Sequence, residues 1–110
     1  MFYVDSETDN IYLSKGDTAV LDIALTLNDN PYVMSGTDTL VFAMKRKNSF
    51  DVVDLEITSS TPEIAFTADS TNALSFGEYD YSITLYYNNG KIDTFVTGTF
   101  TILGVSYNAT

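Results

Sequence analysis

The sequence predicts an all-β chain folded as an antiparallel β-sandwich, and three observations lead to this prediction. Apolar and polar residues alternate with period two along most of the chain, and no helical period persists beyond a couple of turns. Turn residues interrupt the alternation about every 8–12 positions, which is the spacing of a sandwich or a barrel. The 110 residues, 45% of them hydrophobic, suit one domain, so we expect a single domain over residues 1–110 with its core at about 10–105.

The first half of the chain contains three predicted strands. Residues 11–13 form a short strand, and residues 19–27 form the most regular one, which ends before Pro31 because proline lacks a backbone donor. The odd positions of 19–27 are apolar, so one face of this strand is expected in the core. A third strand, residues 39–47, buries its even positions and points Val41 outward, toward a covering segment or a partner.

The second half begins with two more predicted strands, residues 51–58 and 63–67. Residues 69–74 are expected to form one helical turn with Asp69 as its N-cap. Later in the chain, Gly98 interrupts the last strand. It marks either a β-bulge or the close approach of another backbone.

The final two strands are joined by the strongest turn signal in the sequence. Asn89-Gly90 favours a two-residue type I′ turn, in which both central residues have positive φ. On the strand before this turn, Tyr86 has the outward parity. On the returning strand, Phe95 has the parity opposite to the apolar row that ends at Ile102, so Phe95 is also expected on the outer face.

This hairpin is entered through Gly77-Glu78-Tyr79-Asp80-Tyr81. In immunoglobulin-like sandwiches, a Tyr near the start of strand F donates a hydrogen bond to the backbone a few residues upstream. Tyr79 occupies that place two residues after Gly77, although an ordinary core tyrosine is the alternative. Tyr81 stands where antibody domains have their second Cys, and its ring would fill the core without a disulfide. Together with about seven or eight predicted strands, this motif predicts an immunoglobulin-like antiparallel β-sandwich.

The residue inventory excludes most catalytic chemistry. The chain has no His and no Cys, so it lacks the usual general base, a thiolate nucleophile and any disulfide. We therefore expect no enzyme, no catalytic residue, no cofactor and no dedicated metal site, although the oxygen-rich segments 5–10 and 28–30 leave calcium open. The net charge of −10 disfavours nucleic acid and anionic membrane surfaces as partners. No run of about 18 apolar residues predicts a membrane span.

Several aromatic side chains fall at positions that one core need not hold. Tyr has an apolar body and a polar tip, which suits protein interfaces and sugar-binding faces. Packing under loops and cross-strand pairing are the alternatives. The residues in question are Phe2, Tyr3, Tyr12, Tyr32, Tyr86 and Tyr107.

Five segments in succession carry a resemblance to known proteins. They are Asn10-Ile11-Tyr12-Leu13-Ser14-Lys15-Gly16-Asp17-Thr18, the loop 28–33, Leu40-Val41-Phe42-Ala43-Met44-Lys45, Phe76-Gly77-Glu78-Tyr79-Asp80-Tyr81 with the Asn89-Gly90 hairpin, and Gly98-Thr99-Phe100-Thr101-Ile102. In this order they resemble small virion domains of phages and prophages, including the N-terminal immunoglobulin-like domain of baseplate upper proteins. The chain ends directly after the predicted sandwich, which favours a small structural or decoration protein over a multidomain baseplate protein.

The resemblance implies a non-enzymatic structural or adhesion module of a phage or prophage virion. Such a module acts through contacts with other virion proteins or with copies of itself, and Val41, Tyr86 and Phe95 are the candidate interface residues. With no signal peptide at Met1, we expect synthesis in the cytoplasm and association with the virion. The alternative is a carbohydrate- or cell-surface-binding module that uses exposed tyrosines, with a glycan as its partner.

Overall fold

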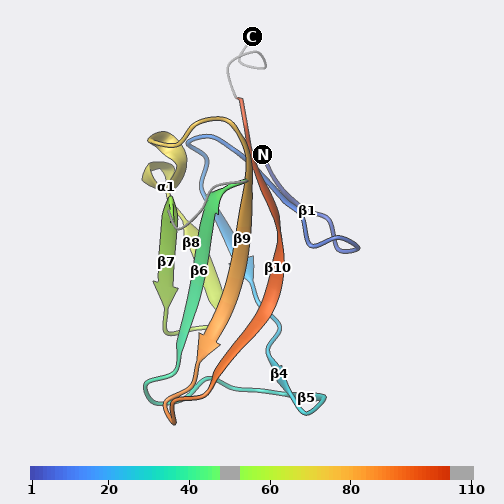
Figure 1. The fold of residues 1–110 in the computed structure, drawn as a ribbon, viewed down its shortest axis with the longest axis vertical. Coiled ribbons are helices and arrows are strands. Elements are labelled where there is room, and N and C mark those ends of the chain that lie inside the picture. The colour runs from blue at the N-terminus through green and yellow to red at the C-terminus, as the bar shows by residue number, and fades with distance from the viewer. Residues whose placement is uncertain (48–52, 105–110) are drawn as a thin grey trace.

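A computed structural model describes residues 1–47 and 53–104 of the chain. Strands dominate these residues, and a short helix lies between β8 and β9 (Figure 1). The elements are β1 (Phe2–Val4), β2 (Ile11–Ser14), β3 (Ala19–Asp22), β4 (Thr26–Leu27), β5 (Asn30–Pro31), β6 (Thr39–Arg46), β7 (Leu55–Ser59), β8 (Glu63–Phe66), α1 (Ala68–Asn72), β9 (Gly77–Tyr86) and β10 (Ile92–Leu103). The predicted strand start at 51–52, the predicted core limit at residue 105 and Tyr107 lie outside the described residues.

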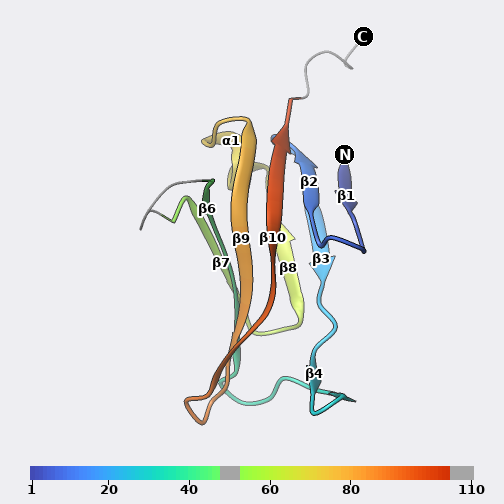
Figure 2. The same cartoon turned by 45° about the vertical axis from the view of Figure 1, so that its right-hand side comes forward.

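The strands form one large sheet and two small ones. The large sheet has six strands in the order β1-β2-β10-β9-β6-β7, and β3 pairs with β8 in a separate sheet. The β3–β8 sheet packs against one face of the large sheet, because the Phe66 ring of β8 lies 5.2 Å from Phe42 of β6 and 5.5 Å from Phe100 of β10 (Figures 1 and 2). The prediction of an all-β fold is confirmed.

One strand pair departs from the predicted antiparallel architecture. β10 runs parallel to β2, with Phe100 opposite Ile11 and Ile102 opposite Leu13, so the large sheet is mixed. Parallel strands require a long crossover connection, and here nearly the whole chain separates the two strands. β1 was not predicted at all, because three residues are too few to display an alternation.

The predicted strand 19–27 is divided in two. Its alternation is as expected, since Leu21, Ile23 and Leu25 are partly or fully buried while the residues between them are exposed. Regular pairing with β8 nevertheless ends at Asp22, and residues 26–27 pair instead with residues 30–31 in a separate hairpin. Pro31 ends up opposite Thr26 in this two-strand ribbon, which has no central ladder position to disturb.

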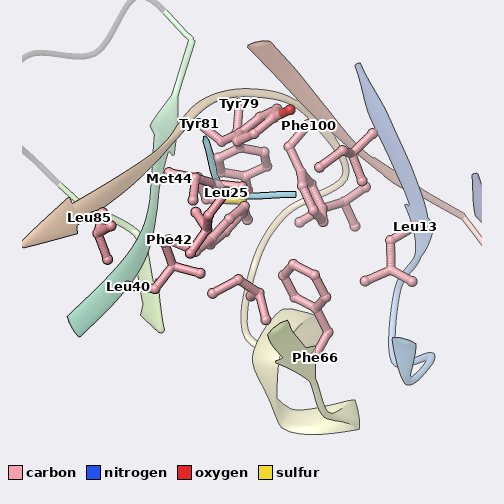
Figure 3. Packing of buried hydrophobic residues seen from close by; sticks show 14 of the residues in the cluster. Leu13, Leu25, Leu40, Phe42, Met44, Phe66, Tyr79, Tyr81, Leu85 and Phe100 are labelled. Atoms are coloured by element: carbon pink, nitrogen blue, oxygen red, sulfur yellow. The ribbon is translucent and has the colours of Figure 1, made fainter. Parts of the chain in front are cut away.

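The core lies between the large sheet and the β3–β8 sheet (Figure 3). Leu40, Phe42 and Met44 of β6 are buried as predicted, and their neighbours Val41 and Ala43 are only partly buried on the opposite face. The odd positions of β9 supply a second buried row: Tyr79, Tyr81, Ile83 and Leu85. The two rows meet through the pairing of β6 with β9, which places Phe42 opposite Ile83.

The helix begins earlier than predicted. α1 spans Ala68–Asn72 with Thr67 as its N-cap, so the assignment of Asp69 as the cap is wrong. Ser70 makes the earlier start favourable, because its hydroxyl accepts a hydrogen bond of 2.9 Å from the Thr67 amide. The buried hydroxyl of Thr71 accepts the Gly16 amide at 2.8 Å, which ties the helix to the turn after β2.

Gly98 is a site of close backbone approach, the second of its two predicted roles. A Cβ atom at this position would lie 2.8 Å from the carbonyl oxygen of Asp9 and 2.9 Å from Cε1 of Tyr81. Both distances are shorter than a normal carbon contact, and one of the neighbours is backbone. The loop before β2 can therefore rest on β10 only while position 98 has no side chain.

We predict that Gly98→Ala destabilises the fold by roughly 1–3 kcal/mol, because the added methyl group must displace the Asp9 backbone or the Tyr81 ring. Urea unfolding followed by circular dichroism measures this as a lower midpoint. Gly104→Ala is the matched control, since the nearest atom to its Cβ would be Cε1 of Phe76 at 4.0 Å. Equal midpoints for Gly98→Ala and the wild type would contradict the close approach.

Candidate functional site

The Gly77-x-Tyr79 motif lies at the start of β9. Gly77 opens the strand with a φ of 123°, a conformation that other residues rarely adopt. The buried Tyr79 hydroxyl donates a hydrogen bond of 2.8 Å to the carbonyl of Ser75, four residues upstream. The guanidinium of Arg46 lies over the Tyr79 ring, 5.4 Å from its centroid. The upstream backbone bond expected of Tyr79 is therefore present.

Tyr81 fills the core and also joins two distant segments. Its ring stacks on Phe42, with centroids 5.5 Å apart and planes 20° from parallel (Figure 3). Its hydroxyl donates to the backbone carbonyl of Asp9, in the loop before β2. Burial raises the pKa of Tyr81 to about 12, and the Asp9 carboxylate adds to the effect. The hydroxyl consequently stays protonated and remains a donor across the physiological pH range.

The turn at Asn89-Gly90 differs from the prediction. Tyr87 and Lys91 close the hairpin with a 2.9 Å backbone bond, and the Gly90 amide donates to the Tyr87 carbonyl at 3.0 Å. The loop therefore has three residues and ends in Gly90 with a φ of 93°, while Asn89 is not among the residues with positive φ. This is a type I turn followed by a left-handed glycine, so the two-residue type I′ assignment is wrong.

Phe95 does not lie on the outer face. The pairing of β10 with β9 shifts between Thr94, opposite Thr84, and Val96, opposite Ile83, so Phe95 is the extra residue of a β-bulge. Beyond the bulge the parity of the strand is reversed. Phe95 packs against the core, and Ile92 is turned outward with 61% of its surface exposed. The expectation that Phe95 points outward is therefore wrong, and Ile92 lies on the outer face instead.

The outer face of the large sheet carries a patch at the hairpin end that we call the neutral patch. Strand register places Val41 beside Thr84 on β9, Thr84 beside Thr94 on β10, and Tyr86 beside Ile92. The hydroxyls of Thr84 and Thr94 lie 3.2 Å apart, and Tyr86 is 43% exposed. Thr58 of β7 lies opposite Val41. The patch consists of Val41, Thr58, Thr84, Tyr86, Ile92 and Thr94.

Charged side chains occupy the other half of the same face. Lys47 forms an ion pair of 2.8 Å with Asp80 and donates to the Thr99 hydroxyl at 3.0 Å. Lys45 lies opposite Asp80 in the register of β6 and β9. The neutral patch therefore contains hydroxyl and apolar groups and no formally charged group, although the net charge of the chain is −10.

The other aromatic candidates divide between surface and core. Tyr3 and Tyr12 lie opposite each other on β1 and β2, with ring centroids 5.9 Å apart, and Tyr3 is 52% exposed. Phe2 packs instead against Phe66 at 6.4 Å. Tyr32 is held in a cluster with Asp38 and Tyr87, so it is unavailable as an exposed platform.

The cluster of Tyr32, Asp38 and Tyr87 was not predicted from the sequence. The carboxylate of Asp38 is buried. It accepts hydrogen bonds from the Tyr32 hydroxyl and from two backbone amides, that of Ser35 at 3.1 Å and that of Asn88 at 2.9 Å. These bonds, with that of Tyr32 first, lower the pKa of Asp38, and the same contact raises the pKa of Tyr32. Asp38 thereby fastens the final hairpin to the segment before β6. The Ser35-x-x-Asp38 spacing indicated a turn but not this distant partner.

The oxygen-rich segments use side chains in hydrogen bonds within the chain. The Asp5 carboxylate accepts the Glu7 amide at 2.9 Å, and the side-chain oxygen of Asn10 accepts the Thr99 amide at 3.1 Å. Within residues 1–47 and 53–104, no group of three or more acidic side chains could hold a metal ion. The same residues contain no helix long and apolar enough to cross a membrane.

In comparisons with protein-family models, curated proteins and solved structures, nothing matched the chain.

We predict that Tyr79→Phe destabilises the fold by about 1–2 kcal/mol, because it removes the hydroxyl bonded to the Ser75 carbonyl. Equilibrium urea unfolding reports the change as a lower midpoint. Tyr86→Phe removes a hydroxyl from an exposed ring and is the control, with an expected change within about 0.5 kcal/mol. An unchanged midpoint for Tyr79→Phe would show that the bond to Ser75 contributes nothing.

We predict that Asp38→Asn lowers the urea midpoint at pH 7, because an amide cannot accept all three hydrogen bonds without presenting its own donors. A lowered pKa in the folded state stabilises the fold above the ordinary carboxyl pKa of about 4, and this stabilisation is lost as the pH falls through the lowered value. The difference between wild type and variant should therefore shrink on acidification. Asp29→Asn, at an exposed turn, is the control; a gap that does not depend on pH would contradict the role of Asp38.

Proposed function

We propose that the chain is an immunoglobulin-like β-sandwich that serves as a structural or adhesion module of a phage or prophage virion, without enzymatic activity. The fold part of this proposal is supported by strand order. Let β3, β6, β7, β8, β9 and β10 correspond to strands B, C, C′, E, F and G. Four neighbouring strands of the six-stranded sheet then have the order C′-C-F-G, and the small sheet pairs B with E. Tyr79 then forms the tyrosine corner at the start of strand F.

The functional part is supported mainly by the neutral patch. Electrostatic repulsion opposes the approach of any two acidic surfaces, and the patch is a part of this acidic chain that carries no formal charge. Its exposed Tyr86 and Ile92 provide apolar area at the hairpin end of the patch, and Thr84 and Thr94 provide hydroxyl groups beside them. This composition suits packing against another virion protein better than binding of a charged ligand. The resemblance of the sequence to virion domains supplies the biological setting.

The alternative function, binding of a carbohydrate or a cell surface, is supported by a different observation. Tyr3 and Tyr12 form a pair of partly exposed rings at the β1 edge of the large sheet. Aromatic faces of this kind suit sugar rings, because the apolar body packs while the hydroxyl bonds to water or ligand. Tyr12 lies opposite Thr101 of β10, at the end of that strand remote from Ile92 and Thr94 of the neutral patch, so mutations separate the two functions.

We predict that virions purified by density gradient from a culture carrying this gene contain the chain, as detected by mass spectrometry. Ile92→Glu should remove it from the particles while the soluble pool remains, because the contact would then desolvate a charge. Val33→Glu, at another exposed apolar position, is the matched control and should be retained. Wild-type chain absent from the particles would contradict the virion proposal. Binding to a glycan array that Tyr12→Ala abolishes would favour the alternative.

A further inference from the structure

A groove opens between the large sheet and the β3 edge of the β3–β8 sheet. It has a volume of about 220 Å³. One wall is residues 21–24, and the opposite wall includes the apolar side chains of Ile11, Ile83 and Val96 from the large sheet. Figure 2 shows the arrangement: β3 is the outer strand of its layer, on the side where β1 and β2 form the edge of the large sheet. We call this feature the seam groove.

The seam groove runs along a strand edge. Successive side chains of a strand point to opposite faces, so a groove lined by four consecutive residues lies beside the backbone and not above one face. Within the described residues, β3 pairs with β8 alone. The Ile23 amide points toward β8, because it donates to the carbonyl of Pro62, the residue before β8, at 2.9 Å. Backbone polar groups alternate in direction along a strand, so the Asp22 amide points toward the free edge.

Two acidic residues line the seam groove, and a third lies beside one of them. Asp9 and Asp22 line it, and register places Asp22 directly opposite Glu63 of β8. Like charges opposite each other on neighbouring strands repel and destabilise the pair. Among the described residues, the ion pairs join Lys47 to Asp80 and the Met1 amino group to Asp17, which leaves these three carboxylates without a cation.

We propose that the seam groove binds an extended peptide segment in which apolar side chains alternate with lysine or arginine. The segment adds to the free edge of β3, its apolar side chains enter the groove, and its cations face Asp22 and Glu63. A lipid or other hydrocarbon would fill the groove but leave the edge amides and the acidic pair without partners. A second copy of the chain is disfavoured as the occupant, because each copy carries a net charge of −10.

The test is a titration of the ¹⁵N-labelled full chain with a synthetic six-residue peptide that alternates valine and lysine, followed by NMR. The amides of Asp22, Ala24 and Val96 should shift, with a Kd at or below about 1 mM. A valine–glutamate peptide and a serine–lysine peptide serve as controls and should bind at least about tenfold more weakly, since each lacks one of the two recognised features. No shift at Asp22 and Ala24, or equal shifts with all three peptides, would overturn the proposal.

Two double variants test whether peptide binding depends on the carboxylates at the groove or only on the net charge of the chain. Asp22→Asn combined with Glu63→Gln should weaken binding of the valine–lysine peptide at least threefold. Asp29→Asn combined with Glu56→Gln removes the same charge elsewhere and should change it less than twofold. Equal losses of affinity in both double variants would overturn the assignment to the groove. Concentration-dependent shifts of the same amides without peptide would also overturn it, because they would identify a second copy of the chain as the occupant. Ile92→Glu should bind the peptide normally, so the result is independent of the neutral patch.

Discussion

The fold depends on one aromatic cluster that joins the two layers. Phe42 of β6, Phe66 of β8, Phe100 of β10 and Tyr81 of β9 come from four strands in two sheets, and each ring lies within 6.5 Å of at least two of the others. No disulfide can join the layers, because the chain has no Cys. The β3–β8 sheet has only two strands, and an isolated two-stranded sheet is marginally stable in water. The small sheet therefore depends on the packing of Phe66 against the large sheet for its stability.

The bulge at Phe95 determines what the surface can do. A regular β10 would have kept Phe95 outward and buried Ile92 near the end of the strand, because period two would have continued through the hairpin. With one extra residue, Phe95 packs against the core and Ile92 joins Tyr86 on the outer face. A large aromatic side chain is thereby removed from the surface and a smaller aliphatic one takes its place. The neutral patch owes its composition to this local change in register as much as to the sequence of its residues.

The sequence was sufficient to predict the faces of long strands, but it did not predict register or turn geometry. The alternation of 39–46 and 79–87 is strict, so the buried rows there followed directly. Turn type depends on how flanking strands pair. Asn89-Gly90 adopts a three-residue loop with its glycine left-handed, while Asn28 and Asp29 have the two positive φ values, 53° and 66°, that a type I′ loop requires. Both dipeptides are compatible with either conformation, so strand pairing decided between them.

Distant contacts were beyond prediction for a different reason. Asp38 looks like an ordinary turn residue, and its bond to the Asn88 amide exists because the segment before β6 and the end of β9 are brought together by the pairing of Thr39 with Tyr86. The seam groove has a similar origin. Asp22 and Glu63 are unremarkable apart in sequence, and their repulsion arises only when β3 and β8 pair in this register. Since a pair of like charges at the end of a short sheet lowers its stability, its presence beside a free strand edge is better explained by a cationic partner than by the stability of the isolated chain.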